Sequence, residues 1–232
     1  MARGNQSLIV AYRGKRLLDV TFSMLGLVVM TPVLAAVAVA VRLAMGSPVF
    51  FRQERPGIFG RPFLIVKFRT MSNERGPDGT ALPDGDRLTG LGRLLRRTSL
   101  DELPELWNVL RGDMSLVGPR PLLFRYLPYF SERERTRLNA RPGITGLAQV
   151  SGRNLVDWDK RLELDAIYVE TISFFLDLRI LVRTLVAVVS REGAQEDPDT
   201  VETWLDEERA GRGIVPGEQG MEIPPPQKGE RS

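Results

Sequence analysis

Two adjacent acidic residues, Asp101 and Glu102, are the first candidates for chemistry in this sequence. A pair of carboxylates can hold Mg²⁺, which prefers oxygen ligands and is usually bound by few protein carboxylates. A carboxylate can also attack phosphorus and form an acyl phosphate. A structural explanation competes with both, because acidic residues are common in the first turn of a helix. The pair by itself therefore leaves a catalytic site and a helix cap open.

Arginines beside rigid or glycine-containing turns form the second group of candidates. Arg120 lies between two prolines in the segment 118–121, which restricts its backbone. Arg153 and Asn154 follow a turn with the sequence Arg-Pro-Gly-Ile-Thr-Gly at 141–146. Because a guanidinium can bind two phosphate oxygens at once, these segments suit phosphate recognition. Rigid surface turns between helices would explain the same residues.

A third candidate is Asp177, which stands within the apolar segment 172–190. An acid in such a segment must be paired, exposed or functional. Arg179 and Arg183 are close in sequence, so an ion pair with one of them competes with a functional role.

A basic segment at 52–57 follows a long apolar run, and we expect it to attract anionic lipid head groups.

The composition excludes several kinds of active site. The chain has 232 residues and contains no Cys and no His, which rules out a cysteine nucleophile, a histidine base and a disulfide framework. Neither of the common glycine-rich nucleotide-binding patterns is present. All but four of the 32 basic residues are arginine, and the formal net charge is +3. This arginine bias fits phosphate recognition, although a high genomic GC content would also produce it.

An uncharged run at 20–41 is long enough to enter a membrane. As a helix it would extend about 33 Å, which matches the hydrocarbon core of a bilayer. Basic residues flank the run on both sides, which favours both ends on the cytoplasmic side. Pro32 can kink the helix, and Thr31 can bond a carbonyl that the kink frees. We therefore expect a re-entrant helix, with a single-pass anchor as the alternative.

The rest of the pattern predicts an α+β fold that is mostly helical. The expected parts are a basic N-terminal segment (1–19), the membrane helix (20–41), a catalytic domain at the membrane surface (42–192) and an acidic, Pro/Gly-rich, largely disordered tail (193–232). A short helix is expected around Trp204 in the tail.

Within the catalytic domain, turn residues predict a small β-hairpin over 49–71 and a polar loop over 73–90. Apolar spacing predicts helices at 101–111, 128–139 and 156–171. The segment 172–190 suits an amphipathic helix in the membrane interface. A membrane-surface site with acids and arginines is what phosphoryl transfer to or from a lipid phosphate requires, because that chemistry depends on positioning and charge neutralisation.

Several segments resemble the bacterial sugar transferase family, the short monotopic polyprenyl-phosphate phosphoglycosyl transferases. They follow one another in unbroken order between about residues 13 and 190: KRLLDVTFSMLGLVVMTPVLA, FRQERPGIFGRPFLIVKFRTM, RRTSLDELPELWNVLRGDMSLVGPRPLL, RPGITGLAQVSGRN and LDAIYVETISFFLDLRILVRT. The resemblance implies transfer of a phospho-sugar from a UDP-sugar to undecaprenyl phosphate, with UMP as the second product. This would be the first membrane step in the assembly of an exopolysaccharide, capsule, O-antigen or glycoprotein glycan.

The resemblance also implies roles for individual residues. Asp101 would attack the β-phosphate and carry a covalent phospho-sugar in a ping-pong route. Glu102 would help Asp101 to hold Mg²⁺ or would assist the handling of protons and charge. The membrane helix would break at Thr31-Pro32, where the family has Ser-Pro. The substrate-binding residues that the resemblance implies are Arg96, Arg120, Arg153, Asn154 and Asp177.

The resemblance places the protein at the cytoplasmic face of the bacterial inner membrane. Its expected partners are the two substrates, membrane lipids and downstream glycosyltransferases, and we expect no nucleic-acid partner. Two other functions compete with the transferase. One is a non-catalytic membrane adaptor of a polysaccharide assembly complex, and the other is a Mg²⁺-dependent phosphohydrolase that releases phosphate rather than UMP.

Overall fold

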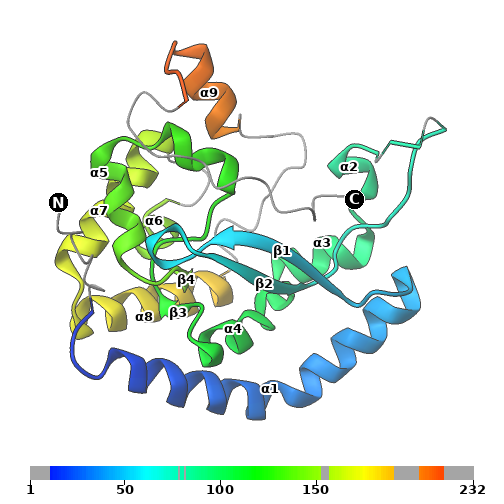
Figure 1. Ribbon diagram of the computed structural model, residues 1–232. Coiled ribbons are helices and arrows are strands. Elements are labelled where there is room, and N and C mark those ends of the chain that lie inside the picture. Colours follow the sequence, from blue (N-terminus) through cyan, green and yellow to red (C-terminus); the bar gives the residue numbers. More distant parts are fainter. Residues whose placement is uncertain (1–10, 78, 81, 153–156, 191–203, 217–232) are drawn as a thin grey trace.

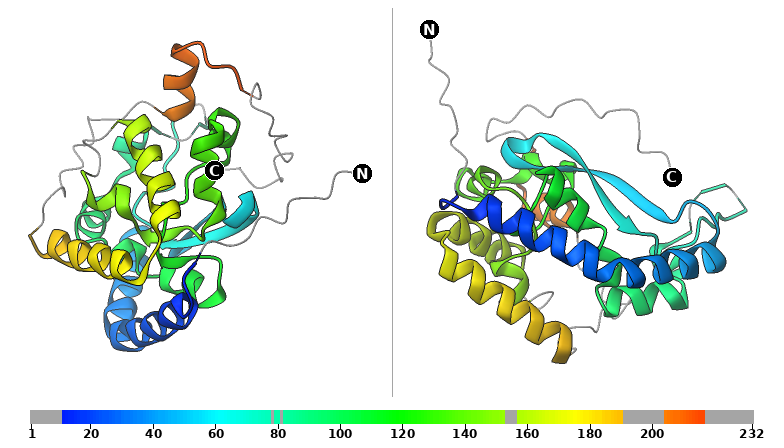
Figure 2. Two further views of the ribbon diagram at one scale, coloured as in Figure 1. Left: turned by 90° about the vertical axis from the view of Figure 1, so that its left-hand side faces the viewer. Right: turned by 90° about the horizontal axis from the view of Figure 1, so that it is seen from below.

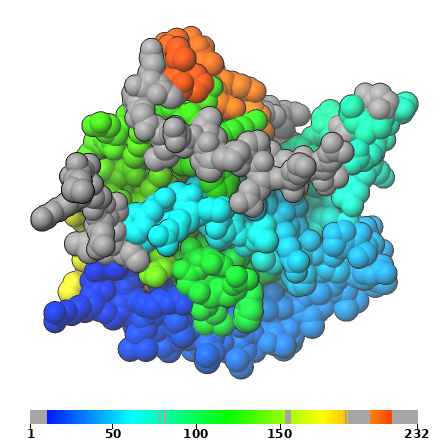
Figure 3. Space-filling view, viewed as in Figure 1, coloured from blue at the N-terminus to red at the C-terminus, as the bar shows by residue number. Residues whose placement is uncertain are grey.

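The computed structural model describes residues 11–77, 79–80, 82–152, 157–190 and 204–216. This part of the chain is mostly helical and contains a two-stranded antiparallel sheet, which confirms the α+β prediction. The long helix α1 (Lys15–Met45) runs along one edge of the molecule, and the strands β1 and β2 cross its middle (Figure 1). The same helix forms the lower edge of the space-filling view (Figure 3).

Helix α1 has 31 residues, is long and apolar enough to cross a membrane, and contains Pro32. It bends near its middle (Figure 1). Pro32 has no N–H to donate to the carbonyl of Val28, which is the usual cause of such a bend. The Thr31 hydroxyl donates to the carbonyl of Leu27 at 2.7 Å. The expected bond from Thr31 is therefore present, but to the carbonyl next to the one that Pro32 leaves free.

Both ends of α1 contact the same folded body. Near the first end, Asp19 Oδ1 accepts hydrogen bonds from Ser115 Oγ and from the backbone N–H of Leu116, each at 3.0 Å. Near the other end, Val37 and Val41 are buried in one cluster with Phe68 and Leu95. A helix that crossed a bilayer would have to take one of these ends away from the domain.

The C-terminus of α1 is closed by Arg69. Its guanidinium donates to the carbonyls of Met45, Gly46 and Ser47, the last two at 2.9 and 3.2 Å. A cation at this position satisfies carbonyls that have no partner within the helix and interacts favourably with the helix dipole.

We expect Arg69→Met to lower the free energy of unfolding by about 1–3 kcal/mol, because the partly buried carbonyls at the end of α1 lose their donor. Hydrogen exchange at residues 43–48 should accelerate, and a thermal unfolding scan should show a lower midpoint. Arg52→Met, which changes an exposed arginine on the neighbouring strand, is the control. Unchanged exchange in the Arg69 variant would contradict a capping role.

The predicted hairpin is confirmed as β1 (Phe50–Pro56) and β2 (Pro62–Phe68), joined by the short turn η1 (Ile58–Gly60). The strands pair in register from Phe50 opposite Phe68 to Pro56 opposite Pro62. Phe63 and Ile65 are buried in one cluster with Val109 and Met114, so one face of the hairpin is turned inward.

Four short helices follow the hairpin. They are α2 (Asp84–Arg87), α3 (Gly90–Arg97), η2 (Leu100–Glu102) and α4 (Glu105–Arg111). The single helix predicted at 101–111 is therefore wrong at its start, because Asp101 and Glu102 lie in a separate 3₁₀ turn before α4. Ser99, with φ of 55°, adopts the left-handed conformation and redirects the chain between α3 and η2.

One side of α4 lies against helix α1, and the other is turned into the domain. Its buried residues are Glu105, Asn108 and Val109, whereas Trp107 is exposed and a Leu106 methyl lies close to Gly26 of α1. The Asn108 amide donates to the carbonyl of Leu64 at 2.7 Å and accepts from the N–H of Val66 at 3.1 Å. This buried amide attaches α4 to strand β2, and it fixes the turn before α4 against the hairpin.

The two turns singled out in the sequence pack against each other. Strands β3 (Ser115–Val117) and β4 (Gly143–Thr145) pair in parallel and bring the segments 118–121 and 141–146 together. A Cβ on Gly143 would lie 2.1 Å from the backbone nitrogen of Gly118, so no larger residue fits this contact without movement.

The remaining helices are η3 (Phe124–Tyr129), α5 (Glu132–Arg135), η4 (Thr136–Asn139), α6 (Leu147–Val150), α7 (Trp158–Thr171), α8 (Phe174–Ser190) and α9 (Leu205–Gly211). Helices α7 and α8 confirm two predictions. The prediction of one helix at 128–139 is wrong in its continuity: η3 ends at Tyr129, and Ser131 caps α5 with a capping box, after which η4 continues to Asn139. Helix α9 is the short helix expected next to Trp204, and its Leu205 is buried in the core with Tyr126 and Trp158.

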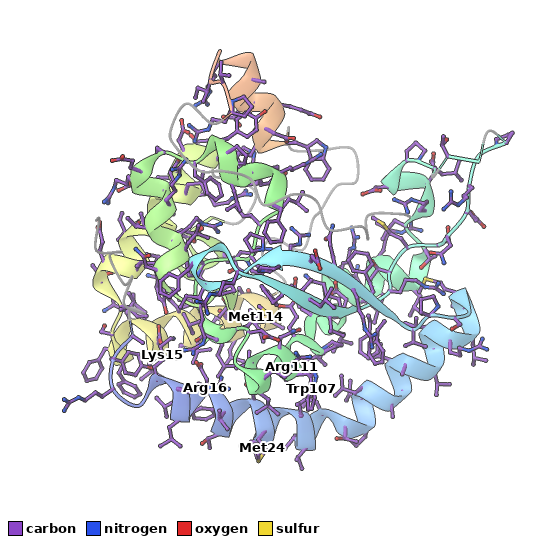
Figure 4. All side chains as sticks on the ribbon, in the orientation of Figure 1. Lys15, Arg16, Met24, Trp107, Arg111 and Met114 are labelled. Carbon is purple, nitrogen blue, oxygen red and sulfur yellow. The ribbon has the colours of Figure 1, made fainter. Side chains whose placement is uncertain are left out.

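One side of the molecule exposes many large apolar residues. Helices α1 and α8 lie on the side seen from below in Figure 2 (right), and Met24 of α1 points away from the domain (Figure 4). The exposed large apolar residues of these two helices are Leu17, Phe22, Met24, Leu25, Val28, Val29, Val33, Val39, Leu43, Phe174, Phe175, Leu178, Val182, Leu185, Val186 and Val188. A patch of this extent marks a membrane or protein interaction surface.

Candidate active site

Asp101 lies in the η2 turn between α3 and α4 and is only 8% exposed. Burial and the neighbouring Glu102 charge raise the pKa of Asp101, and the positive charges of Lys67, Arg96 and Arg120 offset part of this rise. Raised basicity makes an ionised carboxylate a better nucleophile. The three cations come from β2, α3 and the turn after β3, so the fold gathers them around one acid.

Glu102 differs from Asp101 in its partners. Its Oε1 accepts from Lys67 Nζ at 2.6 Å and from Arg120 Nη2 at 2.7 Å. Burial would raise the pKa of Glu102, but Arg120 and Lys67 outweigh it and lower the pKa to about 2. Two adjacent acids thus have pKa values shifted in opposite directions, which is typical of carboxylates with different roles.

Sequence reasoning missed Lys67 and Glu105 as members of this site. Lys67 Nζ lies 3.0 Å from Glu105 Oε1 as well as close to Glu102. Glu105 is 2% exposed, and burial together with the Glu102 charge raises its pKa to about 7 against the opposing effect of Lys67. An isolated lysine in an arginine-rich chain was the one available sequence signal.

The buried Glu105 predicts a pH dependence of stability. A carboxyl group whose folded pKa is raised binds its proton more tightly when folded, so its contribution to stability falls as pH rises from about 4.5 to about 7. As pH rises from about 5 to about 8, we expect Glu105→Gln to become more stable relative to the parent chain. The measurement is the difference between their unfolding midpoints in a buffer that contains a chelator. A difference that does not grow over this pH range would contradict a raised pKa for Glu105.

The backbone of Arg120 is bound by a buried ion pair between Arg137 and Asp165. Its own side chain is 46% exposed, which leaves it accessible to a ligand. Arg137 donates to the Arg120 carbonyl at 2.6 Å and binds Asp165 through Nε and Nη2 at 3.1 and 2.8 Å. The Arg137 and Asp165 side chains are each only 3% exposed. No local pattern in the sequence predicts this pair, because its members come from η4 and α7.

Of the predicted substrate-binding residues, the structure brings Arg96 and Arg120 to Asp101. The Arg96 Nε donates to Thr70 Oγ1 at 3.2 Å, and its charge acts on Asp101. Arg153 and Asn154 lie outside the described residues. Thr31 and Pro32 lie in the middle of α1, as the prediction requires.

Asp177 lies in a separate buried cluster at the start of α1 and α8. It forms an ion pair with Lys15 at 2.5 Å, so the competing prediction of a pair with Arg179 or Arg183 is wrong. Asp177 also accepts from the hydroxyls of Tyr168 at 2.8 Å and Tyr12 at 3.1 Å. Lys15 stands where α1 joins the domain (Figure 4). These side-chain contacts attach the start of α1, and Tyr12 before it, to α7 and α8.

The acids near Asp101 do not form a protein-only metal cage. Within the described ranges, no group of three or more Asp or Glu has the arrangement of a metal site. Asp101 and Glu102 still provide two adjacent carboxylates, and Oε1 of Glu102 is already bound to Lys67 and Arg120. This donor set fits an ion such as Mg²⁺ that takes one or two carboxylates and completes its shell with substrate oxygens and water.

Comparison with known proteins gives a consistent result. Residues 10–191 match the family model described as bacterial sugar transferase. The chain is 52% identical over 182 residues to an uncharacterized sugar transferase, EpsL, of Bacillus subtilis, covering 78% of this chain and 90% of that protein. It is 44% identical over 190 residues to a UDP-glucose:undecaprenyl-phosphate glucose-1-phosphate transferase of Caulobacter vibrioides, covering 78% and 71%. It is 39% identical over 197 residues to an undecaprenyl-phosphate galactose phosphotransferase of Salmonella typhimurium, covering 78% and 41%.

Proposed function

The chain belongs to the bacterial sugar transferase family and is a phosphoglycosyl transferase, and from this premise we propose its reaction. It transfers a phospho-sugar from a UDP-sugar to undecaprenyl phosphate and yields undecaprenyl diphosphate-sugar and UMP. The observation that carries the proposal is the cluster of Asp101 and Glu102 with Lys67 and Arg120. The names of the relatives support a UDP-sugar donor and an undecaprenyl-phosphate acceptor.

In the first step, an oxygen of Asp101 attacks the β-phosphorus of the UDP-sugar. The bond between the β-phosphorus and the oxygen that bridges it to the α-phosphate breaks, and UMP leaves with the electron pair. The sugar phosphate is then held on Asp101 as an acyl phosphate. Arg120 and Lys67 lie where they can offset the negative charge that develops on the phosphoryl oxygens.

In the second step, an oxygen of undecaprenyl phosphate attacks the same phosphorus. The bond from phosphorus to Asp101 breaks, which regenerates the carboxylate and releases the lipid-linked product. Glu102 stays ionised through both steps and keeps Lys67 and Arg120 in place. Asp101 and Glu102 would hold Mg²⁺, which would neutralise further phosphate charge.

The membrane arrangement in this proposal is re-entrant. Both ends of α1 are attached to one body, the first through Asp19 and the other through Val41. The outer surfaces of α1 and α8 are apolar and would enter the bilayer from the cytoplasmic face. This places the soluble domain at head-group depth, where the phosphate of the lipid acceptor lies.

The test uses the full chain in nanodiscs with Mg²⁺, undecaprenyl phosphate and a panel of UDP-sugars labelled with ³²P at the β-phosphate. We expect UMP release that depends on the lipid under turnover conditions. Without the lipid, we expect label on the protein that hydroxylamine removes, as an acyl phosphate requires. Undecaprenyl phosphate added after this labelling step should then take up the label from the protein.

Different results would support the competing functions. Release of inorganic phosphate from undecaprenyl phosphate without any nucleotide-sugar would indicate a phosphohydrolase. A folded, membrane-bound protein that releases UMP from no sugar and acquires no label would favour the adaptor.

A further inference from the structure

Arg55 in strand β1 is a partly buried cation that the proposed mechanism does not use. Its Nε is buried and has no hydrogen-bond partner, and its Nη2 donates to Gln53 Oε1 at 2.6 Å. Across the described parts of the chain, no carboxylate forms an ion pair with Arg55. Burying a charge without a counter-charge is costly, so the position calls for an explanation beyond hairpin stability.

The register of the hairpin turns Arg55 toward the acidic cluster. Arg55 lies opposite Phe63, and Lys67 lies opposite Phe51. Because residues two apart share one face of a strand and paired residues share the same face, Arg55 and Lys67 belong to the same side of the hairpin. Lys67 on that side already binds Glu102 and Glu105.

Arg55 also lies within reach of the charge of Arg120. Burial and the Arg120 charge lower the pKa of Arg55 to about 10, and Glu105 offsets only part of that change. Arg120 has Glu102 as its counter-charge, whereas Arg55 has none among the residues that the structure describes. Pro56, the residue that follows Arg55, lines the same small hollow as Arg120. An anion bound there between the two guanidinium groups would relieve their repulsion.

We propose that Arg55 is a phosphate-binding residue of this site and acts with Arg120 on a phosphoryl group of the substrate. The proposal rests on the proposed function, since that reaction brings phosphoryl groups to Asp101. The diphosphate of the UDP-sugar and the phosphate of the lipid present the same chemistry to a guanidinium. The two half-reactions separate these sources.

The experiment compares Arg55→Gln and Arg55→Lys with the parent chain in nanodiscs. The first half-reaction is measured as UMP release and protein labelling without lipid, and the second as transfer of preformed label to undecaprenyl phosphate. Arg52→Gln is the matched control. Arg52 is exposed and lies on the same strand, and its substitution removes the same charge from the opposite face of the hairpin. We expect Arg55→Gln to slow at least one half-reaction about 10- to 100-fold, as loss of a charge-assisted hydrogen bond does.

Stability is the readout that a structural role would move. Because Arg55 lacks a counter-charge, Arg55→Gln should keep or raise the thermal midpoint while the rate falls. Arg55→Lys keeps the charge but loses the planar fork, so its rate should fall between those of the parent and Arg55→Gln. Calorimetric titration with UDP should show weaker binding in both variants if the donor phosphates are the ligand.

Each outcome bears on the proposal. Loss in the first half-reaction alone assigns Arg55 to the donor diphosphate, loss in the second alone to the lipid phosphate, and loss in both to the transferred phosphoryl group. Parent-like rates in both, or a rate loss matched by a lower midpoint, would overturn it. If the parent chain itself releases no UMP, the proposed function fails, and the UDP titration alone decides for or against Arg55 as a phosphate ligand.

Discussion

Asp101→Asn is expected to abolish covalent labelling and to reduce UMP release by about 10³-fold or more, because the amide is a poor nucleophile for phosphorus. The change is nearly isosteric and removes a carboxylate that is costly to bury, so the fold should persist. The measurement is the amount of ³²P on the protein without lipid, together with the steady-state rate of UMP release with lipid. Asp84→Asn, which neutralises an exposed acid in α2, is the control for charge and handling.

Glu102→Gln separates the roles of the two acids. It removes the counter-charge of Lys67 and Arg120 but leaves the carboxylate of Asp101 in place. We therefore expect slower but detectable labelling in this variant. Labelling that persists in Asp101→Asn and disappears in Glu102→Gln would assign the nucleophile to Glu102 instead.

Lys15→Met is expected to lower the free energy of unfolding by about 3–5 kcal/mol, the usual cost of removing one partner of a buried ion pair. The side chains of Lys15 and Asp177 are 8% and 6% exposed, and the variant leaves the Asp177 charge without its cation. Lys15 also donates to the carbonyl of Val117 at 3.0 Å, so the contact between α1 and β3 weakens as well. Denaturant unfolding in detergent measures the loss, and Arg179→Met, which changes an exposed arginine of α8, is the control.

The double variant Lys15→Met with Asp177→Leu shows whether the loss comes from an unpaired charge. Replacing both partners by apolar residues should recover part of the stability, since the buried charge is then gone. Asp177→Asn tests the predicted substrate role of this residue. A slower half-reaction with unchanged stability would place Asp177 in substrate binding, whereas a loss of stability with parent-like kinetics of the folded fraction would make it structural.

The sequence by itself predicted those elements whose signals are local. An uncharged run and a central Pro32 indicated the long bent helix, and turn residues between apolar runs indicated the hairpin. Helices α7 and α8 follow from apolar spacing within single segments. Asp101 and Glu102 could be predicted as site residues because they are adjacent acids in the chain.

Tertiary structure decided which charges meet. Asp177 has Arg179 two residues away, but residues two apart on a helix do not face each other, and its partner Lys15 lies 162 positions earlier in the chain. Lys67 and Arg120 reach Glu102 from 35 and 18 positions away, through the hairpin register and the contact between β3 and β4. No local pattern encodes such pairs, because they depend on how separate elements pack.

Tertiary structure also decided what the apolar residues face. The periodicity of 101–111 indicated an amphipathic helix, but its acid Glu105 and amide Asn108 are buried while Trp107 is exposed. Periodicity reports that a helix has an apolar side, and it does not report whether that side meets a protein core, a neighbouring helix or lipid. In this protein the polar side of α4 faces inward because the interior at that point is the acidic cluster itself, held by Lys67 and attached to β2 through Asn108.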